Sequence, residues 1–451
     1  MERYKYFCIR RGLTTIARVR WKIIISYLVL ILTVLVLMPA VTSADPDHKF
    51  IVSIKSSEID DDTKIISIEA EDHENYGEEA VKKCKAFFIF LKHAGDLTYN
   101  SNKDSIQENL SEWELDSNFD DFLNELEGIR IELNRNPLIN IPNLKKVINM
   151  GRVLNLNIKT ECTLTAATET STRDENKTFL HQNIDSSIDE FIYNYFHICY
   201  VAKIMGKFNY TFWHTPVLGE FPFLNEKGLG FAGAKLGLKS SGPVNTSDDL
   251  TDMPSYWLTR RTLMNCSRVT SDFDFNNVKM LWNCSDRASG RDKTWPHIWD
   301  NQNMIWCDRF GGILAIEQMH DYFVAKTENP IWPDNPDILW KTCHHMWNET
   351  NYTGSQSGSE LYEKSSSGPR AERAYELLND TYYGELTEQI FKWKIAKDIY
   401  GGSDNNSQDE NDICRNATVR AYIIQPKPGV EKVSWTYGNP YDHDFIDFTF
   451  V

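Results

Sequence analysis

Few side chains in this sequence have the types and spacing that catalysis or metal binding requires. Asp272 and Asp274 lie one residue apart in the segment DFD. Two carboxylates so spaced in an extended turn can both reach one hard cation. Glu317 and His320 are three residues apart and share a face of a predicted helix, but they supply only one arm of a two-arm metal motif. The two aspartates are therefore the candidate metal ligands.

Several common catalytic patterns are absent from the sequence. It contains no HExxH, no GxSxG and no CxxC, so zinc-protease, α/β-hydrolase and thioredoxin-type chemistry lack their sequence signals. The stretch GLGFAGAKLG at 228–237 follows no apolar strand, and its glycines are predicted to serve turns. The DFD segment resembles the DxD motif with which luminal glycosyltransferases hold a metal on a nucleotide-sugar diphosphate.

A second resemblance involves tryptophans and one glutamate. The order of LWNC (281–284), MIWC (304–307), NPDILWKT (335–342) and TYYGELTE (381–388) is similar to that in ADP-ribosyl cyclases and related NAD glycohydrolases. The resemblance implies that Trp282 and Trp340 stack on the nicotinamide and ribose end of NAD. It also implies that Glu388 is the catalytic acid that stabilises the ribosyl cation. These three residues are the candidate catalytic residues.

The segment KTWPHIWDNQNMIWCDRFGG, residues 293–312, holds three tryptophans and allows two interpretations. Trp295, Trp299 and Trp306 do not form a clean helical stripe, which favours side chains that fill separate parts of a core. Each indole N–H needs a partner, and the neighbouring Asn and Gln side chains can supply it. The alternative is that the segment forms the wall of a ligand pocket.

The N-terminus predicts entry into the secretory pathway. Residues 1–22 carry seven Lys or Arg and one acid, and residues 23–44 are 22 residues without a charge. That length can cross a bilayer as a helix, and the basic flank predicts a cytoplasmic N-terminal end. Pro39 and the segment Thr-Ser-Ala before Asp45 resemble a signal-peptidase site. The protein is thus predicted to be either secreted or a single-pass type II membrane protein with a luminal or extracellular body.

Sequons and cysteines support the same compartment. Eleven Asn-X-Ser/Thr sites are present, and nine are predicted glycan acceptors: Asn109, Asn176, Asn209, Asn245, Asn348, Asn351, Asn379, Asn405 and Asn416. Eight cysteines follow residue 44, and an even number in an oxidising compartment predicts up to four disulfides of unassigned pairing. They are Cys84, Cys162, Cys199, Cys266, Cys284, Cys307, Cys343 and Cys414.

The charge balance excludes one class of partner. The formal net charge is −16, and it becomes −22 once residues 1–44, with seven basic residues and one acid, are removed. Nucleic-acid binding needs a concentrated basic face, so no nucleic-acid partner is expected. A membrane contact is expected only through residues 23–44, if they are retained. An extracellular protein or carbohydrate partner fits the composition, and the sequence identifies no cofactor.

The distribution of patterns predicts an α+β protein. Residues 45–185 form an acidic, mainly helical region after the 1–44 segment, with helices expected at 78–95 and 117–137. Residues 186–451 form a Trp/Cys-rich α+β domain, expected to be stapled by disulfides, with eight of the thirteen tryptophans between Trp257 and Trp347. Further helices are predicted at 186–206, 311–326, 369–380 and 385–402, and antiparallel strands in the C-terminal tail.

Two function classes follow from these features. The first is a secreted or membrane-anchored glycoprotein with a binding, adhesion or matrix role. The second is a luminal enzyme, either a glycosyltransferase that uses Asp272 and Asp274 or an NAD-consuming enzyme that uses Trp282, Trp340 and Glu388. A cleft that brings the candidate residues together would favour the second class.

Overall fold

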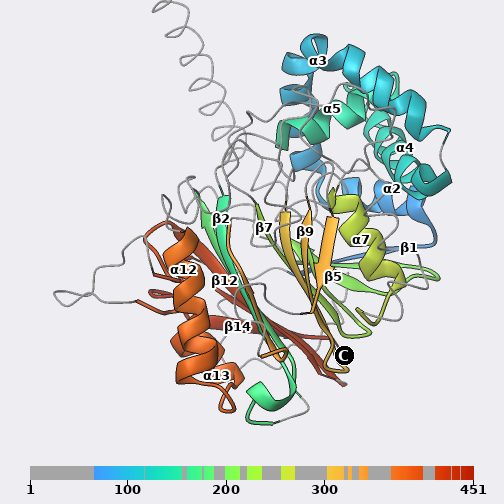
Figure 1. Ribbon diagram of the computed structural model, residues 1–451. Coiled ribbons are helices and arrows are strands. Elements are labelled where there is room, and N and C mark those ends of the chain that lie inside the picture. Colours follow the sequence, from blue (N-terminus) through green and yellow to red (C-terminus); the bar gives the residue numbers. More distant parts are fainter. Residues whose placement is uncertain are drawn as a thin grey trace, which may run out of the picture.

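The computed structural model describes residues 65–115, 117–154, 160–174, 177–186, 199–213, 221–235, 255–269, 302–318, 323–327, 335–343, 367–399, 412–427, 429–436 and 438–450. Two β-sheets face each other, and helices cover the outer face of each (Figure 1). The predicted α+β class is therefore confirmed. The predicted boundary at residue 185 falls inside β3, whose sheet also contains strands from the C-terminal region.

The first sheet has eight strands in the order β1-β4-β5-β6-β7-β8-β9-β10. All neighbours are antiparallel except β1 and β4, which run parallel from Ile65↔Cys199 to Ala70↔Ile204. The strands are β1 (Ile65–Ala70), β4 (Cys199–Ile204), β5 (Tyr210–Trp213), β6 (Phe221–Asn225), β7 (Leu229–Lys235), β8 (Gln302–Asp308), β9 (Ile313–Gln318) and β10 (Phe323–Lys326).

The second sheet has six antiparallel strands in the order β11-β2-β3-β12-β13-β14. They are β2 (Thr160–Ala167), β3 (Phe179–Ser186), β11 (Ile338–Lys341), β12 (Thr418–Lys427), β13 (Val430–Thr436) and β14 (Phe445–Thr449). The short η2 (Glu169–Ser171) lies between β2 and β3. The antiparallel strands predicted for the C-terminal tail are confirmed.

The helices form two outer layers. On the side of the eight-stranded sheet are α2 (His73–Lys83), α3 (Lys85–Trp113), η1 (Ser117–Phe119), α4 (Asp120–Asn134), α5 (Leu144–Leu154) and α7 (Ser255–Asn265). On the six-stranded sheet lie α12 (Ser367–Tyr375), η3 (Glu376–Thr381), α13 (Glu388–Ile390) and η4 (Phe391–Ile395) (Figure 1). The helices predicted at 78–95, 117–137, 369–380 and 385–402 all have counterparts here, although the chain continues as helix past Gly95 to Trp113.

Two glycines let α2 and α4 cross closely. A Cβ added at Gly77 would lie 2.1 Å from the carbonyl oxygen of Glu125, and one added at Gly128 would lie 2.0 Å from that of Glu74. Neither position has room for a side chain, so backbone packs against backbone at the crossing. This contact holds the helical layer at a fixed angle.

A buried charge cluster joins the same helices to α7. The Glu125 carboxylate accepts hydrogen bonds from both terminal nitrogens of Arg260, with Nη1 2.5 Å from Oε2. It also contacts His73 Nδ1. His73 Nε2 lies 3.2 Å from Asp121. Glu125 and Arg260 are fully buried, and the Arg260 guanidinium lies over the rings of Tyr76 and Trp257. The cluster satisfies charges that would otherwise be costly to bury.

One predicted helix is wrong throughout its described residues, and a second is wrong at its C-terminal end, while its residues 187–198 lie outside the described ranges. The segment predicted as a helix over 311–326 forms β9 and β10, which pair antiparallel from Phe323↔Gln318 to Lys326↔Ala315. The segment predicted over 186–206 ends as β4, a strand held between β1 and β5. In β4 and β9 the apolar residues are buried on two faces, so they do not alternate as a half-exposed strand would.

The expected disulfide staples are also wrong. Cys84, Cys162, Cys199 and Cys307 are free thiols, and no disulfide joins any two of the seven cysteines in the described residues. The eighth, Cys284, lies outside them. None of the helices in the described ranges combines the length and apolar character needed to cross a membrane. Residues 1–44, on which the predicted anchor and localisation depend, lie outside those ranges.

Candidate active site at Cys162

The strands β2 and β3 present different side chains to their two faces. On β2, Cys162, Leu164 and Ala166 belong to the core that includes the eight-stranded sheet. The intervening Thr163 faces the other way and accepts a hydrogen bond from Arg370 on α12. This alternation follows from the two-residue period of a strand. The side chain of Cys162 therefore faces the eight-stranded sheet, while its carbonyl oxygen is within reach of Arg370 on α12.

Three polar groups of Cys162 each have a buried contact. Its amide nitrogen lies 3.0 Å from Cys343 Sγ, and its carbonyl oxygen accepts from Arg370 Nη1 at 3.1 Å. Its own Sγ lies 3.3 Å from Gln182 Nε2. Gln182 is fixed by Gly233 of the facing sheet, through bonds of 2.6 and 3.1 Å, and by Tyr422. The thiol, the amide and the carbonyl of Cys162 are thus each held by a separate buried group.

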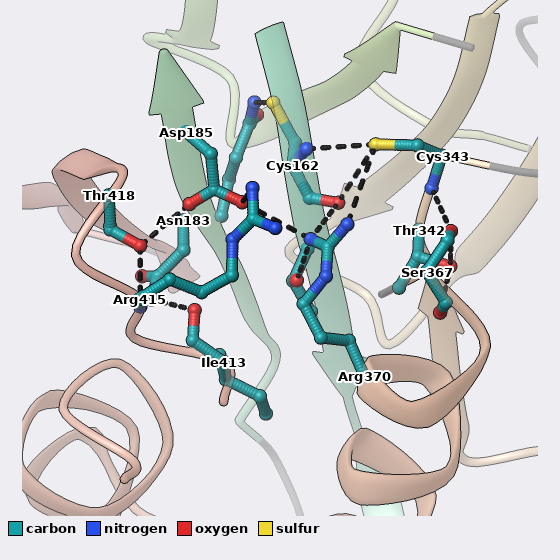
Figure 2. A network of polar contacts seen from close by, with 12 residues as sticks. Cys162, Asn183, Asp185, Thr342, Cys343, Ser367, Arg370, Ile413, Arg415 and Thr418 are labelled. Carbon is teal, nitrogen blue, oxygen red and sulfur yellow. Dashed lines mark hydrogen bonds and ion pairs between the residues drawn. The ribbon is translucent and has the colours of Figure 1, made fainter. Parts of the chain in front are cut away.

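A shared carboxylate connects two buried arginines at this point. Asp185 Oδ2 lies 3.2 Å from Arg370 Nη1 and 3.0 Å from Arg415 Nη2, while Oδ1 accepts from Thr418 at 2.6 Å. Figure 2 shows both guanidinium groups beside the Asp185 carboxylate. Asp185 and Arg370 are at most 1% exposed. The arginines come from α12 and from the turn before β12, so the carboxylate ties two distant segments to β3.

The start of α12 holds Cys343. The amide of Cys343 donates to Ser367 Oγ at 2.9 Å, and Ser367 Oγ is 2.9 Å from Thr342 Oγ1. Ser367 is the first residue of α12, and Pro369 follows within the first turn, where a missing N–H costs nothing. Cys343 Sγ also lies 3.9 Å from Arg370 Nη2 (Figure 2). The hydrogen bond from the Cys343 amide to Ser367 therefore helps to hold the Cys343 sulfur beside the nitrogen of Cys162.

The surroundings of the Cys162 thiol favour its protonated form. Burial raises its pKa well above the ordinary 9.0, the nearby Cys343 and Asp185 raise it further, and hydrogen bonds from the Gln182 side chain and the Asp185 backbone only partly offset this. No histidine is among the contacts of Cys162 in the described residues. The nearby His181 faces the helices, bonded to Thr165 and Asn183, and burial lowers its pKa to about 4. A cysteine–histidine pair is therefore not formed here.

The eight-stranded sheet adds a buried ion pair at the same end of the sandwich. Lys341 Nζ on β11 lies 2.6 Å from Glu317 Oε1 on β9, and both side chains are fully buried. Asn303 on β8 donates to the carbonyl oxygen of Thr342 at 2.7 Å. Burial lowers the pKa of Lys341, and Glu317 counters that effect. The two sheets are thus clamped together by polar bonds next to Cys162.

The structure places two of the predicted site residues apart from this cluster. Trp340 lies in the core under α12, with its ring 5.2 Å from that of Tyr375. Glu388 starts α13 and binds Lys392 and Lys432 at 2.6 and 2.5 Å. Although burial alone would raise the pKa of Glu388, the two lysines hold it below its ordinary value. Glu388 is thus engaged in an ion-pair network.

Other predicted site residues fall outside the described ranges or occupy ordinary positions. Trp282, Asp272, Asp274 and the side chains of Asn109, Asn176, Asn245, Asn348, Asn351 and Asn405 lie outside them. Among the described sequons, Asn416 is exposed, whereas Asn209 and Asn379 are partly buried and bonded to Glu226 and Tyr375. Trp306 is fully buried against Phe231, as the core interpretation expected. Within the described residues, no group of three or more His, Cys, Asp or Glu is placed to hold a metal ion.

The residues of the Cys162 site were missed at the level of sequence. Cys162 was assigned to disulfides, and Asp185, Arg370 and Arg415 were not singled out. One signal was present: His181, Asn183 and Asp185 occupy alternate positions in FLHQNID, which places these polar residues on one face of a strand. Such a face must meet buried partners, but their identity depends on the fold.

Comparison with known proteins gives only distant likenesses. No family model and no curated protein matches the sequence. Two similar solved structures are of the conjugated bile acid hydrolase from Clostridium perfringens. One, a cysteine-to-alanine mutant, has 13% identity and a TM-score of 0.34, and the match covers 64% of this chain and 97% of that one. The other, an arginine-to-leucine variant, has 12% identity and a TM-score of 0.28, and the match covers 65% and 89%.

These findings correct one expectation from the sequence. The chain was expected to be a secreted or membrane-associated glycoprotein stapled by disulfides. The described cysteines form no disulfide with one another, so the disulfide staples are not present among them. The localisation, which depends on residues 1–44, stays a prediction.

Proposed function

We propose that the protein is a cysteine-dependent acyl-transfer enzyme, most simply an amide hydrolase, whose nucleophile is Cys162 Sγ. The observation that carries this is that the buried Cys162 thiol lies 3.3 Å from Gln182 Nε2, while the main-chain nitrogen of the same residue lies 3.0 Å from Cys343 Sγ. Cysteine attacks acyl carbons once a neighbouring base removes its proton. The proposal falls in the enzyme class that the sequence offered as the alternative to a binding role, with different chemistry and different residues.

Among the described residues, no base contacts the Cys162 thiol. The main-chain nitrogen of Cys162 is part of an amide, and an amide nitrogen cannot accept the thiol proton. Attack of Cys162 Sγ on the carbonyl carbon of Glu161 would form a C–S bond and break the C–N bond, with the thiol proton passing to the departing nitrogen. The Glu161 acyl group would thereby move from nitrogen to sulfur. Water would then hydrolyse the thioester, leaving a carboxylate on Glu161 and a free α-amine on Cys162. Such an amine has an ordinary pKa of about 7.7–8.0 and can serve as the base.

The mature reaction would then use this amine twice. It takes the proton from Sγ, and the thiolate attacks the carbonyl carbon of the substrate amide. The protonated amine gives its proton to the leaving nitrogen, so that the C–N bond breaks and a thioester remains on Cys162. Water, deprotonated by the same amine, releases the acid. Gln182 stabilises the thiolate by donating to sulfur, and Arg370 fixes the residue through its carbonyl oxygen.

Mass spectrometry of the full chain tests the proposal. The expected result is two fragments that meet between Glu161 and Cys162, the second labelled at its N-terminus by 2-cyanobenzothiazole, which condenses with a terminal cysteine. The Cys162→Ala variant should remain one chain. Cys199→Ser, which changes another buried thiol, should be cleaved like the natural protein.

The processed protein should also release aminomethylcoumarin from N-acyl derivatives with short, medium or long acyl chains, and this activity should require Cys162. A natural chain that stays intact, or a Cys162→Ala chain cut at the same bond, would rule out the proposed activation. The binding, adhesion or matrix role stays an untested alternative, as do the glycosyltransferase and NAD-cleavage hypotheses.

A further inference from the structure

Cys343 occupies a special position relative to Cys162. The pairing of β11 with β2 joins Lys341 to Leu164, and the same antiparallel register sets Cys343 opposite Cys162. Directly opposed residues on antiparallel strands present their side chains to the same face, with Cα atoms about 4.5–5.5 Å apart. The result is the 3.0 Å contact between Cys343 Sγ and the nitrogen of Cys162. This contact joins a main-chain nitrogen to a side-chain sulfur, unlike the backbone hydrogen bonds that pair β11 with β2.

The sulfur is held in place from three directions. The Cys343 amide is bonded to Ser367 Oγ, and the neighbouring carbonyl of Thr342 accepts from Asn303 of the other sheet. Arg370 Nη2 approaches the sulfur at 3.9 Å, and the sulfur lies 3.5 Å from the carbonyl oxygen of Cys162. Cys343 is 5% exposed, so water does not compete freely for its sulfur.

We infer that Cys343 is a positioning residue for the reaction proposed above. Its sulfur holds the α-amine of Cys162 in place and stabilises the ammonium form of that amine only weakly. This inference rests on the proposed function and deepens it. A thiol sulfur is a weak hydrogen-bond acceptor, whereas a hydroxyl oxygen is a good one. Hydrogen bonding to the charged form of a group favours that form. A sulfur at this position therefore leaves more of the amine in its basic form near neutral pH than an oxygen would.

Several charged or titratable groups surround the same nitrogen. Arg370 on α12 and the thiol of Cys162 itself are its immediate neighbours, and Asp185 on β3 lies behind Arg370 with Arg415 beyond it. The Glu317–Lys341 pair lies on the strands that precede Cys343 and face it. These groups remain unchanged when only residue 343 is replaced, so a change in the amine can be assigned to the acceptor.

Two substitutions separate this role from simple packing. In Cys343→Ser an oxygen replaces the sulfur, and the pKa of the amine should rise by about one unit. In Cys343→Ala the acceptor is lost, and the pKa should fall by a similar amount. The readout is the pH at which alkylation of Cys162 by iodoacetamide is half-maximal, followed by mass spectrometry of the processed protein. The midpoint should move to higher pH in the serine variant and to lower pH in the alanine variant.

The outcomes distinguish the two proposals. Melting curves establish that each variant is folded, and Cys199→Ser should keep the natural midpoint. Equal midpoints in all proteins, or shifts of the same sign in both Cys343 variants, would overturn the role of Cys343 while leaving the nucleophile intact. An unprocessed natural chain, or no alkylation of Cys162 at any pH, would instead overturn the proposed function.

Discussion

Replacing Asp185 by Asn should destabilise the fold far more than its size suggests. The carboxylate is 1% exposed and accepts from Arg370, Arg415 and Thr418 at 3.2, 3.0 and 2.6 Å. Asparagine has nearly the same shape, but it carries no charge and turns one acceptor into a donor. Both guanidinium groups would lose their shared counter-charge in a site closed to water. Breaking a buried ion pair from one side costs about 3–5 kcal/mol.

The assay is unfolding in urea, followed by fluorescence and by pulse proteolysis of both proteins. The matched control is Asp96→Asn, because Asp96 also binds two cations, Lys92 and Lys146, each at 2.8 Å. The Asp96 side chain is 36% exposed, so its loss should cost less than about 1 kcal/mol. Equal losses of unfolding free energy in the two variants would refute the view that burial makes the Asp185 network costly to break.

Three further predictions concern other parts of the fold. Burial lowers the pKa of His73, but two neighbouring carboxylates raise it above 6.5 overall. The stabilisation of the fold by His73 is therefore full below pH 6.5 and is lost as the pH rises through the raised pKa. Thermal melting of His73→Gln across this pH range should lack that loss. Gly128→Ala should lower the free energy of unfolding in urea by about 1–3 kcal/mol, because its Cβ would meet backbone atoms. Gly95→Ala, whose Cβ would make only ordinary contacts at 3.4 Å, should instead stabilise α3 by about 0.5–1 kcal/mol. Lys341→Met should cost about 3–5 kcal/mol, and adding Glu317→Met should recover much of it; a double variant no more stable than the single would contradict this.

The sequence predicted helices well where one face is apolar and the other is polar. The stripe of α4 is an example, with Phe122, Leu126, Ile129 and Leu133 buried and acids between them. It failed where both faces are buried. In β9 four successive residues from Ile313 to Ile316 are buried, so no alternation marks the strand. Short apolar runs of this kind fit a helix or a central strand equally, and only the strand's neighbours decide.

The site was harder to predict than the fold because its residues are far apart in the chain. Cys162, Asp185, Cys343, Arg370 and Arg415 meet only because β2 lies between β3 and β11, under α12. An even number of cysteines predicted disulfides, yet Cys162 is a free thiol bonded to Gln182. Cysteine counting assumes that the residues pair with one another. It cannot recognise a thiol whose hydrogen-bond partner is a glutamine side chain.

The parallel pairing of β1 with β4 has a further consequence if the chain is cut before Cys162. The segment before the cut contains β1 and the helices α2 to α5, and it would keep its place only through non-covalent contacts. These include six residue pairs of the β1–β4 ladder and the ion pair of Glu125 with Arg260. The protein would then be a complex of two polypeptides, and its refolding would depend on concentration. Dilution during unfolding would separate the pieces and make the loss of structure practically irreversible.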